Sequence, residues 1–272
     1  MPATFFVVPQ WQGSGSSRAM RLIDGAEAIR GDLPSAATVP VEVPAGAGSD
    51  EGTMVNRLSS VIAVRDALDG AMAGRTGPPV VIGGDCGVEL APVARAAAGG
   101  SIALLWLGAH PDLNSPETST TSAFHGMVLR TLLGEGPDSL LPSTPLSPDR
   151  VVLAGTRALD DAEQDYVDAN GIRLIAPSEL TPESVAAALA ATGAESVYVH
   201  VDLDVLDPAE IDGIGFPEPF GLTLAQLIAT IAAAKDALPL AGAGVTEFAP
   251  ASPESAADDL GTILRIIGAL TA

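Results

Sequence analysis

The chain has a single cysteine, Cys86, among its 272 residues. One cysteine cannot form an intrachain disulfide, so the disulfide framework of small extracellular proteins is excluded and a reducing cytoplasm is the expected location. No run approaches the roughly 20 apolar residues that a bilayer-spanning helix requires. The short apolar run at the N-terminus has no basic segment before it. We therefore expect neither secretion nor insertion into a membrane.

Basic residues are also scarce. Lys and Arg number 13 against 34 Asp and Glu, which gives a formal net charge of −21. Such a chain repels nucleic-acid phosphates and anionic lipids and attracts cations, so neither a nucleic acid nor a membrane is an expected partner. A metal ion or a cationic small molecule fits this charge. The acidic excess could instead serve solubility alone, because net charge bears on association rather than on fold.

Short apolar runs alternate with longer amphipathic segments, which predicts an α/β fold with a mostly parallel central sheet and helices on both faces. The expected strands are residues 4–8, 38–43, 79–82, 102–107, 151–154, 196–201 and 243–246, and the expected helices are residues 55–72, 88–97, 124–133, 160–169, 182–191, 223–237 and 253–270. The loop-rich segments 13–48 and 134–149 are too short to be domains. We predict a single domain over residues 1–272.

Candidate metal ligands stand just after three predicted strands: Cys86 after the first, His110 and Asp112 after the second, and Asp202 and Asp204 after the third. In a parallel sheet, reactive groups gather beyond the carboxyl ends of the strands. Alternate residues of an extended strand point to one side, so each pair can aim two ligands at one spot. Two such pairs and a thiolate could hold a small cluster of divalent cations.

Each of these groups also has an ordinary structural explanation. A lone buried cysteine is usually a small core residue. An Asp-x-Asp pair is common in loops, and a His-x-Asp pair can be a hydrogen-bonded turn. The recurrence of such groups after three strands, rather than any one of them, favours the metal site.

The residues around these positions resemble the arginase, agmatinase and formiminoglutamase family. The family patterns Gly-Gly-Asp-His, Asp-Ala-His-x-Asp and Asp-x-Asp-x-x-Asp-Pro correspond to residues 83–86, 108–112 and 202–208. Residues 109–119 and 124–127 look more like arginase proper than agmatinase. The resemblance implies a three-layer arginase-like fold, Mn²⁺ as the metal with one or two ions, a small guanidino amino acid as the substrate and assembly into a homo-oligomer.

By position, the resemblance assigns the metal ligands to Cys86, His110, Asp112, Asp202 and Asp204. Two positions depart from the pattern. Cys86 stands where the family has a histidine, and Gly108 stands where it has an aspartate that bridges two ions. The formal charge of the cluster is unchanged, because a thiolate adds the negative charge that the missing carboxylate removes, but the ligand count falls by one. Thiolate also shifts the preference toward softer ions such as zinc, iron or cobalt.

The resemblance also implies roles in catalysis and substrate binding. The catalytic residues would be His125, a proton shuttle, Asp112, a metal ligand, and Glu247, which pairs with the guanidinium group. The substrate-binding residues would be Asn114, Ser119, Thr121, Asp160, Glu163 and Glu247. Asp160 and Glu163 could instead be acids at the start of a helix. Ala123 and Phe216 replace an asparagine and a threonine of the family, so side-chain specificity can differ.

In the family, metal-activated water attacks the guanidino carbon and releases a urea and an amine. The altered cluster resembles that of members that hydrolyse Nω-hydroxy-L-arginine to hydroxyurea and L-ornithine in the biosynthesis of the antibiotic D-cycloserine, and we predict this reaction. An N-hydroxyguanidine is less basic than a guanidine, so it more readily presents a neutral, electrophilic carbon to a weaker cluster. Two alternatives stay open: an ordinary arginase acting on L-arginine, and a catalytically silent homologue that binds a ligand.

Overall fold

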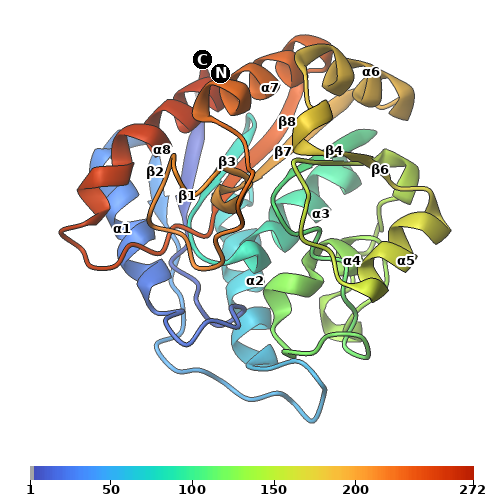
Figure 1. The fold of residues 1–272 in the computed structure, drawn as a ribbon. Helices are drawn as coiled ribbons and strands as arrows, with labels where there is room; N and C mark the ends of the chain where they lie inside the picture. Colours follow the sequence, from blue (N-terminus) through green and yellow to red (C-terminus); the bar gives the residue numbers. More distant parts are fainter. Residues whose placement is uncertain (1–2) are drawn as a thin grey trace.

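A computed structural model describes residues 3–272, which form one eight-stranded sheet and eight α-helices (Figure 1). The strands are β1 (Thr4–Val7), β2 (Thr38–Pro40), β3 (Pro79–Ile82), β4 (Ile102–Leu107), β5 (Val151–Ala154), β6 (Arg173–Ile175), β7 (Ser196–Asp202) and β8 (Leu240–Thr246). Their order is β2-β1-β3-β8-β7-β4-β5-β6, and every neighbouring pair is parallel. The predicted α/β fold is confirmed, and the sheet is parallel throughout rather than mostly parallel.

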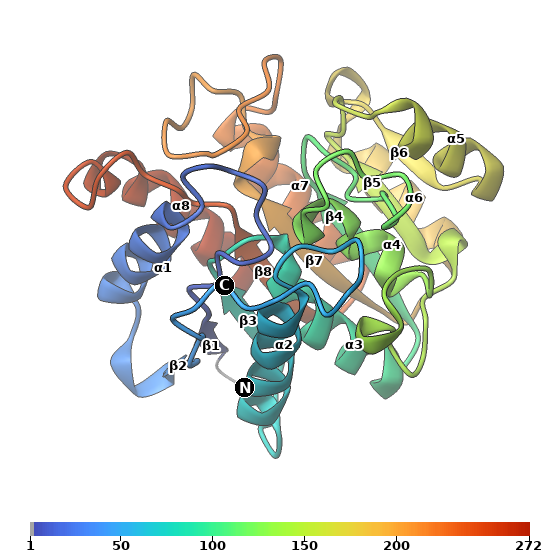
Figure 2. The same cartoon turned by 90° about the horizontal axis from the view of Figure 1, so that it is seen from below.

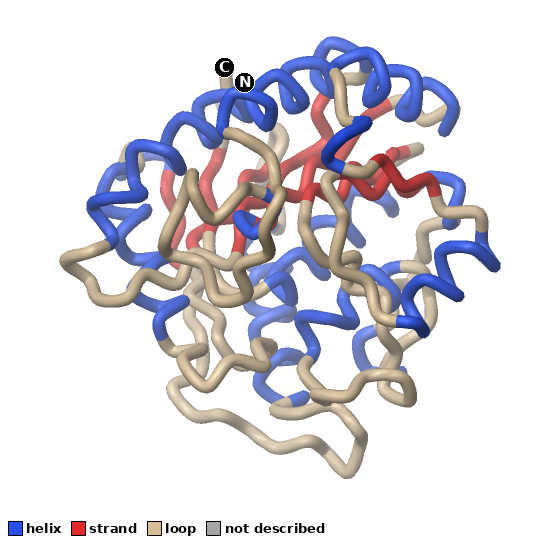
Figure 3. Tube along the Cα trace, viewed as in Figure 1, coloured by secondary structure: helices blue, strands red, loops and turns tan. Residues whose placement is uncertain are grey.

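Helices cover both faces of the sheet, so the fold has three layers (Figures 1, 2 and 3). They are α1 (Arg21–Asp32), α2 (Leu58–Met72), α3 (Leu90–Gly99), α4 (Val128–Leu132), α5 (Asp161–Asn170), α6 (Pro182–Thr192), α7 (Leu224–Ala237) and α8 (Ala256–Thr271). Helices α1, α8, α7 and α6 pack on one face, and α2, α3, α4 and α5 on the other. None of the helices in residues 3–272 combines the length and apolar character needed to cross a bilayer.

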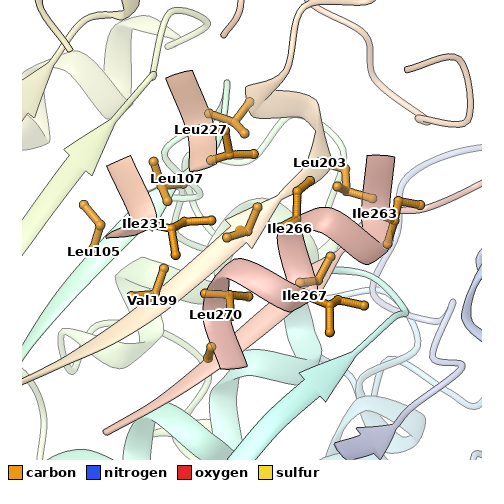
Figure 4. Close-up of a cluster of buried hydrophobic side chains, with 14 of the residues drawn as sticks. Leu105, Leu107, Val199, Leu203, Leu227, Ile231, Ile263, Ile266, Ile267 and Leu270 are labelled. Carbon is orange, nitrogen blue, oxygen red and sulfur yellow. The ribbon is translucent and has the colours of Figure 1, made fainter. Parts of the chain in front are cut away.

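The central strands are buried on both faces, as their continuous apolar sequences predict. All six residues of β4 are buried, and alternate ones enter different apolar clusters. Leu105 and Leu107 pack with α7 and α8, where Ile231 and Ile266 lie over the sheet (Figure 4), while Trp106 packs on the opposite face. Burying one such side chain contributes roughly 1.5–3 kcal/mol, so these two clusters hold the three layers together.

Helix α1 lies in a segment that the sequence indicated as loop-rich, and that prediction was wrong. No side chain caps its N-terminus, and a glycine interrupts its apolar pattern. The helix is stabilised instead by the burial of Leu22, Ala26 and Ile29, which form one apolar stripe that packs against the rest of the fold. Gly25 allows this close packing, because a Cβ atom there would overlap the carbonyl oxygen of Phe248.

Three smaller expectations were also wrong. The sequence did not indicate β6, which is a three-residue edge strand. Strand β2 ends at Pro40 rather than at residue 43. The expected helix over 124–133 is a 3₁₀ turn, Phe124–Met127, followed by the short α4. Short elements of this kind carry too few apolar repeats for periodicity to define them.

The strand order brings the carboxyl ends of β3, β8, β7 and β4 together at the centre of the sheet. The chain passes from β3 to β4 through α3, and β8 and β7 later fill the two positions between them. Ligands of open α/β sheets bind beyond the carboxyl ends of the strands, at the point where the strand order changes direction. The predicted ligands follow β3, β4 and β7, so the topology gathers them at this point.

Candidate active site

A cavity of about 350 Å³ lies at the carboxyl ends of the central strands. Its lining residues are His110, Asp112, Asn114, Ser119, Thr120, Thr121, His125, Gly126, Ala158, Leu159, Asp160, Glu163, Asp202, Asp204, Gly215, Phe216 and Glu247. Every site residue predicted from the sequence is among them except Cys86, which is buried and contacts Asp202 and Glu247. The volume is in the range of roughly 300–1,000 Å³ that is usual for small-molecule sites.

Asp202 and Asp204 connect the ends of β7 and β4. The Asp202 Oδ1 atom accepts a 2.8 Å hydrogen bond from the backbone N–H of Asp204, which starts the 3₁₀ turn Leu203–Val205. The Asp204 Oδ1 atom accepts from the backbone N–H of Ala109 at 2.7 Å, and Oδ2 lies 2.7 Å from His110 Nδ1. Burial lowers the pKa of His110, but the hydrogen bond to Asp204 and the charges of Asp204, Glu218 and Glu163 together outweigh burial, and the pKa is raised.

Two acidic residues of the cavity have left-handed backbone conformations. The φ angles of Asp112 and Glu247 are 53° and 67°, a region in which a non-glycine residue carries strain on the order of 1–3 kcal/mol. Hydrogen bonds hold both conformations: the carbonyl oxygen of Asp112 accepts from Leu129 and Arg130 at 3.0 and 3.2 Å, and the N–H of Glu247 donates to Gly84 at 2.9 Å. Strain of this kind is typical of functional sites, and here both carboxylates line the cavity.

Cys86 begins the short turn that follows β3. The Asp85 side chain caps this turn by accepting a hydrogen bond from the backbone N–H of Gly87. Burial, and then the charge of Glu247, raises the pKa of Asp85 to about 6. The Cys86 Sγ atom lies 3.2 Å from Asp202 Oδ2, and its N–H donates to Glu247 Oε1 at 3.2 Å. Burial and then the charge of Asp202 raise the pKa of the thiol, so the metal-free protein holds it protonated.

Asp112, Asp202 and Asp204 form the acidic floor of the cavity, and their carboxylates repel one another. Burial and then the charge of Asp204 raise the pKa of both Asp112 and Asp202 well above the ordinary value. Within residues 3–272, no Lys or Arg side chain forms an ion pair with these three carboxylates. A divalent cation would displace the protons and balance the charge. Carboxylate ligands suit Mn²⁺, whereas imidazole and the Cys86 sulfur favour softer ions, so the donor set fits a divalent metal.

His125 and Phe216 stand over this floor. The His125 Nδ1 atom lies 3.5 Å from Glu247 Oε1. Burial alone would lower the pKa of His125, but the interaction with Glu247 outweighs burial and raises it. The ring of Phe216 lies 5.1 Å from the His125 ring and 6.5 Å from the His110 ring, centroid to centroid. Phe216 therefore contacts both histidine rings at once, an arrangement that the sequence did not predict.

The outer part of the cavity is polar and combines structural with exposed groups. Asp160 caps α5 by accepting from the N–H of Glu163, and the Glu163 carboxylate accepts in turn from the N–H of Asp160. The second Asp160 oxygen accepts from Asn114 at 2.8 Å, and Glu163 accepts from Leu113 at 3.1 Å. Asp160 and Glu163 are thus helix-start acids and cavity-lining residues at the same time.

Sequence reasoning missed Arg157 and His200. The Arg157 guanidinium donates to six carbonyl oxygens, among them those of Asp204 and Glu218, and so holds the loop after β7 against the end of β5. His200 lies on β7 with its ring fully buried, 3.8 Å from the Cys86 sulfur. The alternation that grouped Asp202 with Asp204 could have found His200, because it precedes Asp202 by two residues.

The fold and the cavity define an α/β protein that carries side chains able to bind metal ions at the carboxyl ends of its central strands. A model of the arginase family matches residues 28–265. The chain belongs to the arginase family.

Individual relatives agree with this membership. An arginase of Staphylococcus aureus (strain MRSA252) is 34% identical over 155 residues, 53% of this chain, and the matched region spans about half, 51%, of that relative. An Nω-hydroxy-L-arginine amidinohydrolase of Streptomyces lavendulae is 29% identical over 264 residues, which are 94% of this chain and 90% of the relative. The crystal structure of an Entamoeba histolytica arginase in complex with L-ornithine has a TM-score of 0.88 at 22% identity, over 98% of this chain and 97% of that chain. The last likeness supports the three-layer fold.

Proposed function

We propose that the protein is a metal-dependent amidinohydrolase that cleaves the guanidino group of an arginine-like amino acid. Its preferred substrate would be Nω-hydroxy-L-arginine, and its products hydroxyurea and L-ornithine. The observation that carries the proposal is the cavity itself, in which an acidic floor, the His125–Glu247 pair and a polar rim lie together. We further propose that the enzyme acts in the cytoplasm, as a homo-oligomer, in antibiotic biosynthesis.

The acidic floor would hold one or two Mn²⁺ ions. The proposed ligands are Cys86, His110, Asp112, Asp202 and Asp204. When bound, the metal would act as a Lewis acid and make a water molecule nucleophilic near neutral pH. The protein's own contribution is to keep the donors oriented, through the hydrogen bonds that connect Asp202, Asp204 and His110.

Glu247 and His125 would act on the reacting group. Glu247 is 4% exposed at the cavity wall, where its carboxylate can bind a guanidinium nitrogen as an ion pair in a site that excludes most water. When water adds to the guanidino carbon and the bond from carbon to the δ-nitrogen breaks, the departing amine requires a proton. His125 would supply it, because the nearby Glu247 favours the protonated ring.

The polar rim, which consists of Asn114, Ser119, Thr121, Asp160 and Glu163, would bind the amino-acid end of the substrate. Asp160 and Glu163 supply negative charge for an α-ammonium group, and Asn114, Ser119 and Thr121 supply donors for an α-carboxylate. These polar groups line the same cavity as the proposed metal ligands, so a free amino acid can contact both sets. This arrangement favours an arginine-like amino acid over agmatine, which has no carboxylate.

Gly108 supports the hydroxylated substrate over L-arginine. It offers no carboxylate beside Asp202 and Asp204, so the cluster lacks a ligand from this position and binds its ions less strongly than a cluster with a carboxylate there. The less basic N-hydroxyguanidine presents a neutral carbon more readily, and its oxygen can serve as a further ligand. An ordinary arginase is the second candidate, and the Staphylococcus aureus relative favours it.

The test is ornithine release from Nω-hydroxy-L-arginine and from L-arginine in parallel, on manganese-loaded protein whose metal content is determined in the same sample. We expect a higher kcat/KM for the hydroxylated substrate. A higher value for L-arginine would instead establish an ordinary arginase. No turnover of either substrate by metal-containing protein would reject the enzymatic function and favour a silent ligand-binding homologue.

A further inference from the structure

A buried histidine lies directly beside the proposed metal ligands, and the proposed reaction does not use it. His200 precedes Asp202 by two residues on β7, so both side chains point to the same side of the strand. The His200 side chain is 0% exposed, and its ring stacks on Trp106 with 3.6 Å between the ring centroids. The packing therefore holds the imidazole in one orientation.

One nitrogen of His200 faces two other donor atoms. His200 Nε2 lies 3.8 Å from Cys86 Sγ, and this sulfur lies 3.2 Å from Asp202 Oδ2. In a tetrahedral site with metal–ligand bonds of about 2.0–2.3 Å, neighbouring ligand atoms are about 3.6 Å apart. The sulfur, nitrogen and oxygen atoms all lie within 4.8 Å of one another. The two distances from the sulfur are therefore close to those between ligands of one ion.

The other nitrogen of His200 faces a buried carboxylate. His200 Nδ1 has no hydrogen-bond partner within residues 3–272 and lies 4.0 Å from Glu89 Oε1. Glu89 is 0% exposed, and neither of its oxygens meets the geometry of a hydrogen bond within residues 3–272, although the Tyr198 hydroxyl lies beside the carboxylate. An unpaired buried carboxylate is strongly unfavourable unless a positive charge is nearby. Metal-bound histidines commonly present their second N–H to a carboxylate, so an ion at Nε2 would account for both orphaned groups.

The neighbouring strand explains why β7 would supply this ligand. Gly108 follows β4, and a Cβ atom built on it would lie 3.4 Å from the Cβ of Asp202. No side-chain ligand can come from that position. His200 restores a donor next to Asp202, from the strand that already carries Asp202.

We propose that Cys86, His200 and Asp202 form a metal site with sulfur, nitrogen and oxygen ligands, and that Glu89 orients His200 within it. A thiolate and an imidazole together favour Zn²⁺, Co²⁺ or Fe²⁺ over Mn²⁺, which prefers oxygen donors. The proposal deepens the metal-dependent function proposed above and rests on it. It also distinguishes the two proposed histidine ligands, since His110 pairs with Asp204 rather than with the sulfur.

The test is Co²⁺ binding to the metal-free full-length protein without oxygen, followed by the thiolate-to-cobalt absorption band and by elemental analysis. We expect the wild-type protein to show the band and Cys86→Ser to lack it. Glu89→Gln should weaken Co²⁺ binding by about 10–100-fold, the usual effect of losing a partner of a ligand, and His200→Gln should weaken it more. Val199→Ala is the control, because Val199 is equally buried on β7 but packs into the apolar cluster on the opposite face of the sheet.

Wild-type affinity and spectrum in a folded His200→Gln variant would overturn the proposal. If that variant does not fold, anomalous diffraction from zinc-loaded wild-type crystals gives the answer directly: zinc bonded to His200 Nε2 supports the site, and zinc beyond bonding distance of it overturns the site. Turnover is measured separately on the wild-type protein. Turnover with a His200-independent metal rejects this site and keeps the enzyme, whereas a His200-bound metal without turnover keeps the site and rejects the enzyme.

Discussion

Restoring the absent carboxylate with Gly108→Asp tests whether the cavity floor requires a cation. A Cβ atom at Gly108 would lie 3.2 Å from the carbonyl oxygen of His110, 3.4 Å from the Cβ of Asp202 and 3.5 Å from Asp204 Oδ1. The side chain therefore fits with small shifts, and its carboxylate stands near two others. Two like charges about 4 Å apart repel by about 4 kcal/mol at an effective dielectric constant of about 20. We expect the metal-free variant at pH 8 to lose about this much free energy of unfolding, which lowers Tm by about 8 °C in a chain of this size.

Gly108→Asn is the matched control, because it adds nearly the same volume without the charge. The Asp variant should melt below the Asn variant in metal-free protein at pH 8, and the gap should shrink at pH 5, where the new carboxyl group stays protonated. With saturating Mn²⁺ the order should reverse, since the carboxylate becomes a ligand. The assays are thermal melting with and without Mn²⁺ and Mn²⁺ titration by calorimetry. Equal melting temperatures of the two metal-free variants at pH 8, together with equal Mn²⁺ affinities, would refute the reasoning.

Three further predictions concern other parts of the site. Arg157→Met removes the donors to six carbonyl oxygens and should lower the free energy of unfolding by on the order of 3 kcal/mol; urea denaturation measures this, and an unchanged midpoint would contradict it. Phe216→Ala should lower kcat by about 10–100-fold through misplacement of His125, with unchanged manganese content, whereas Phe216→Leu should lose less. Removing metal with EDTA should lower Tm more at pH 8 than at pH 5. The pKa values of Asp112 and Asp202 are raised in the metal-free fold, so protonation of these carboxyl groups stabilises it and this stability is lost as pH rises through the raised pKa values. An equal loss of Tm at both pH values would argue against this explanation.

Much of the fold could be predicted because its signals are local. The six apolar residues of β4 are all buried, as a continuous apolar run predicts for a central parallel strand. Thr181 and Thr223 cap α6 and α7 by accepting from backbone N–H groups three residues on, a signal that lies within a few residues of each helix start. Helix α1 could not be predicted this way, because its packing against Phe248 depends on a residue more than 200 positions away.

The candidate site shows the same division. The residue types and their places at or just after the ends of β3, β4 and β7 are readable along the chain. Strand alternation, however, does not form the two pairs: Asp112 lies in the loop after β4 with a φ of 53°, and Asp204 lies in the 3₁₀ turn after β7. Neither the 3.5 Å approach of His125 to Glu247 nor the contact of Phe216 with two histidines has a local signal. Both contacts join segments that are distant in sequence.

The sequence by itself determined the α/β class, the ligand types and their placement at strand ends, because backbone periodicity and strand direction act over a few residues. Only the tertiary structure decided which strand ends meet, how Arg157 holds the loop after β7, and that His200 and Glu89 stand behind Cys86. The physical reason is that strand order and side-chain packing depend on contacts between residues far apart in the chain. A short motif identifies which residues can be ligands, but the packing of the sheet sets the distances between them.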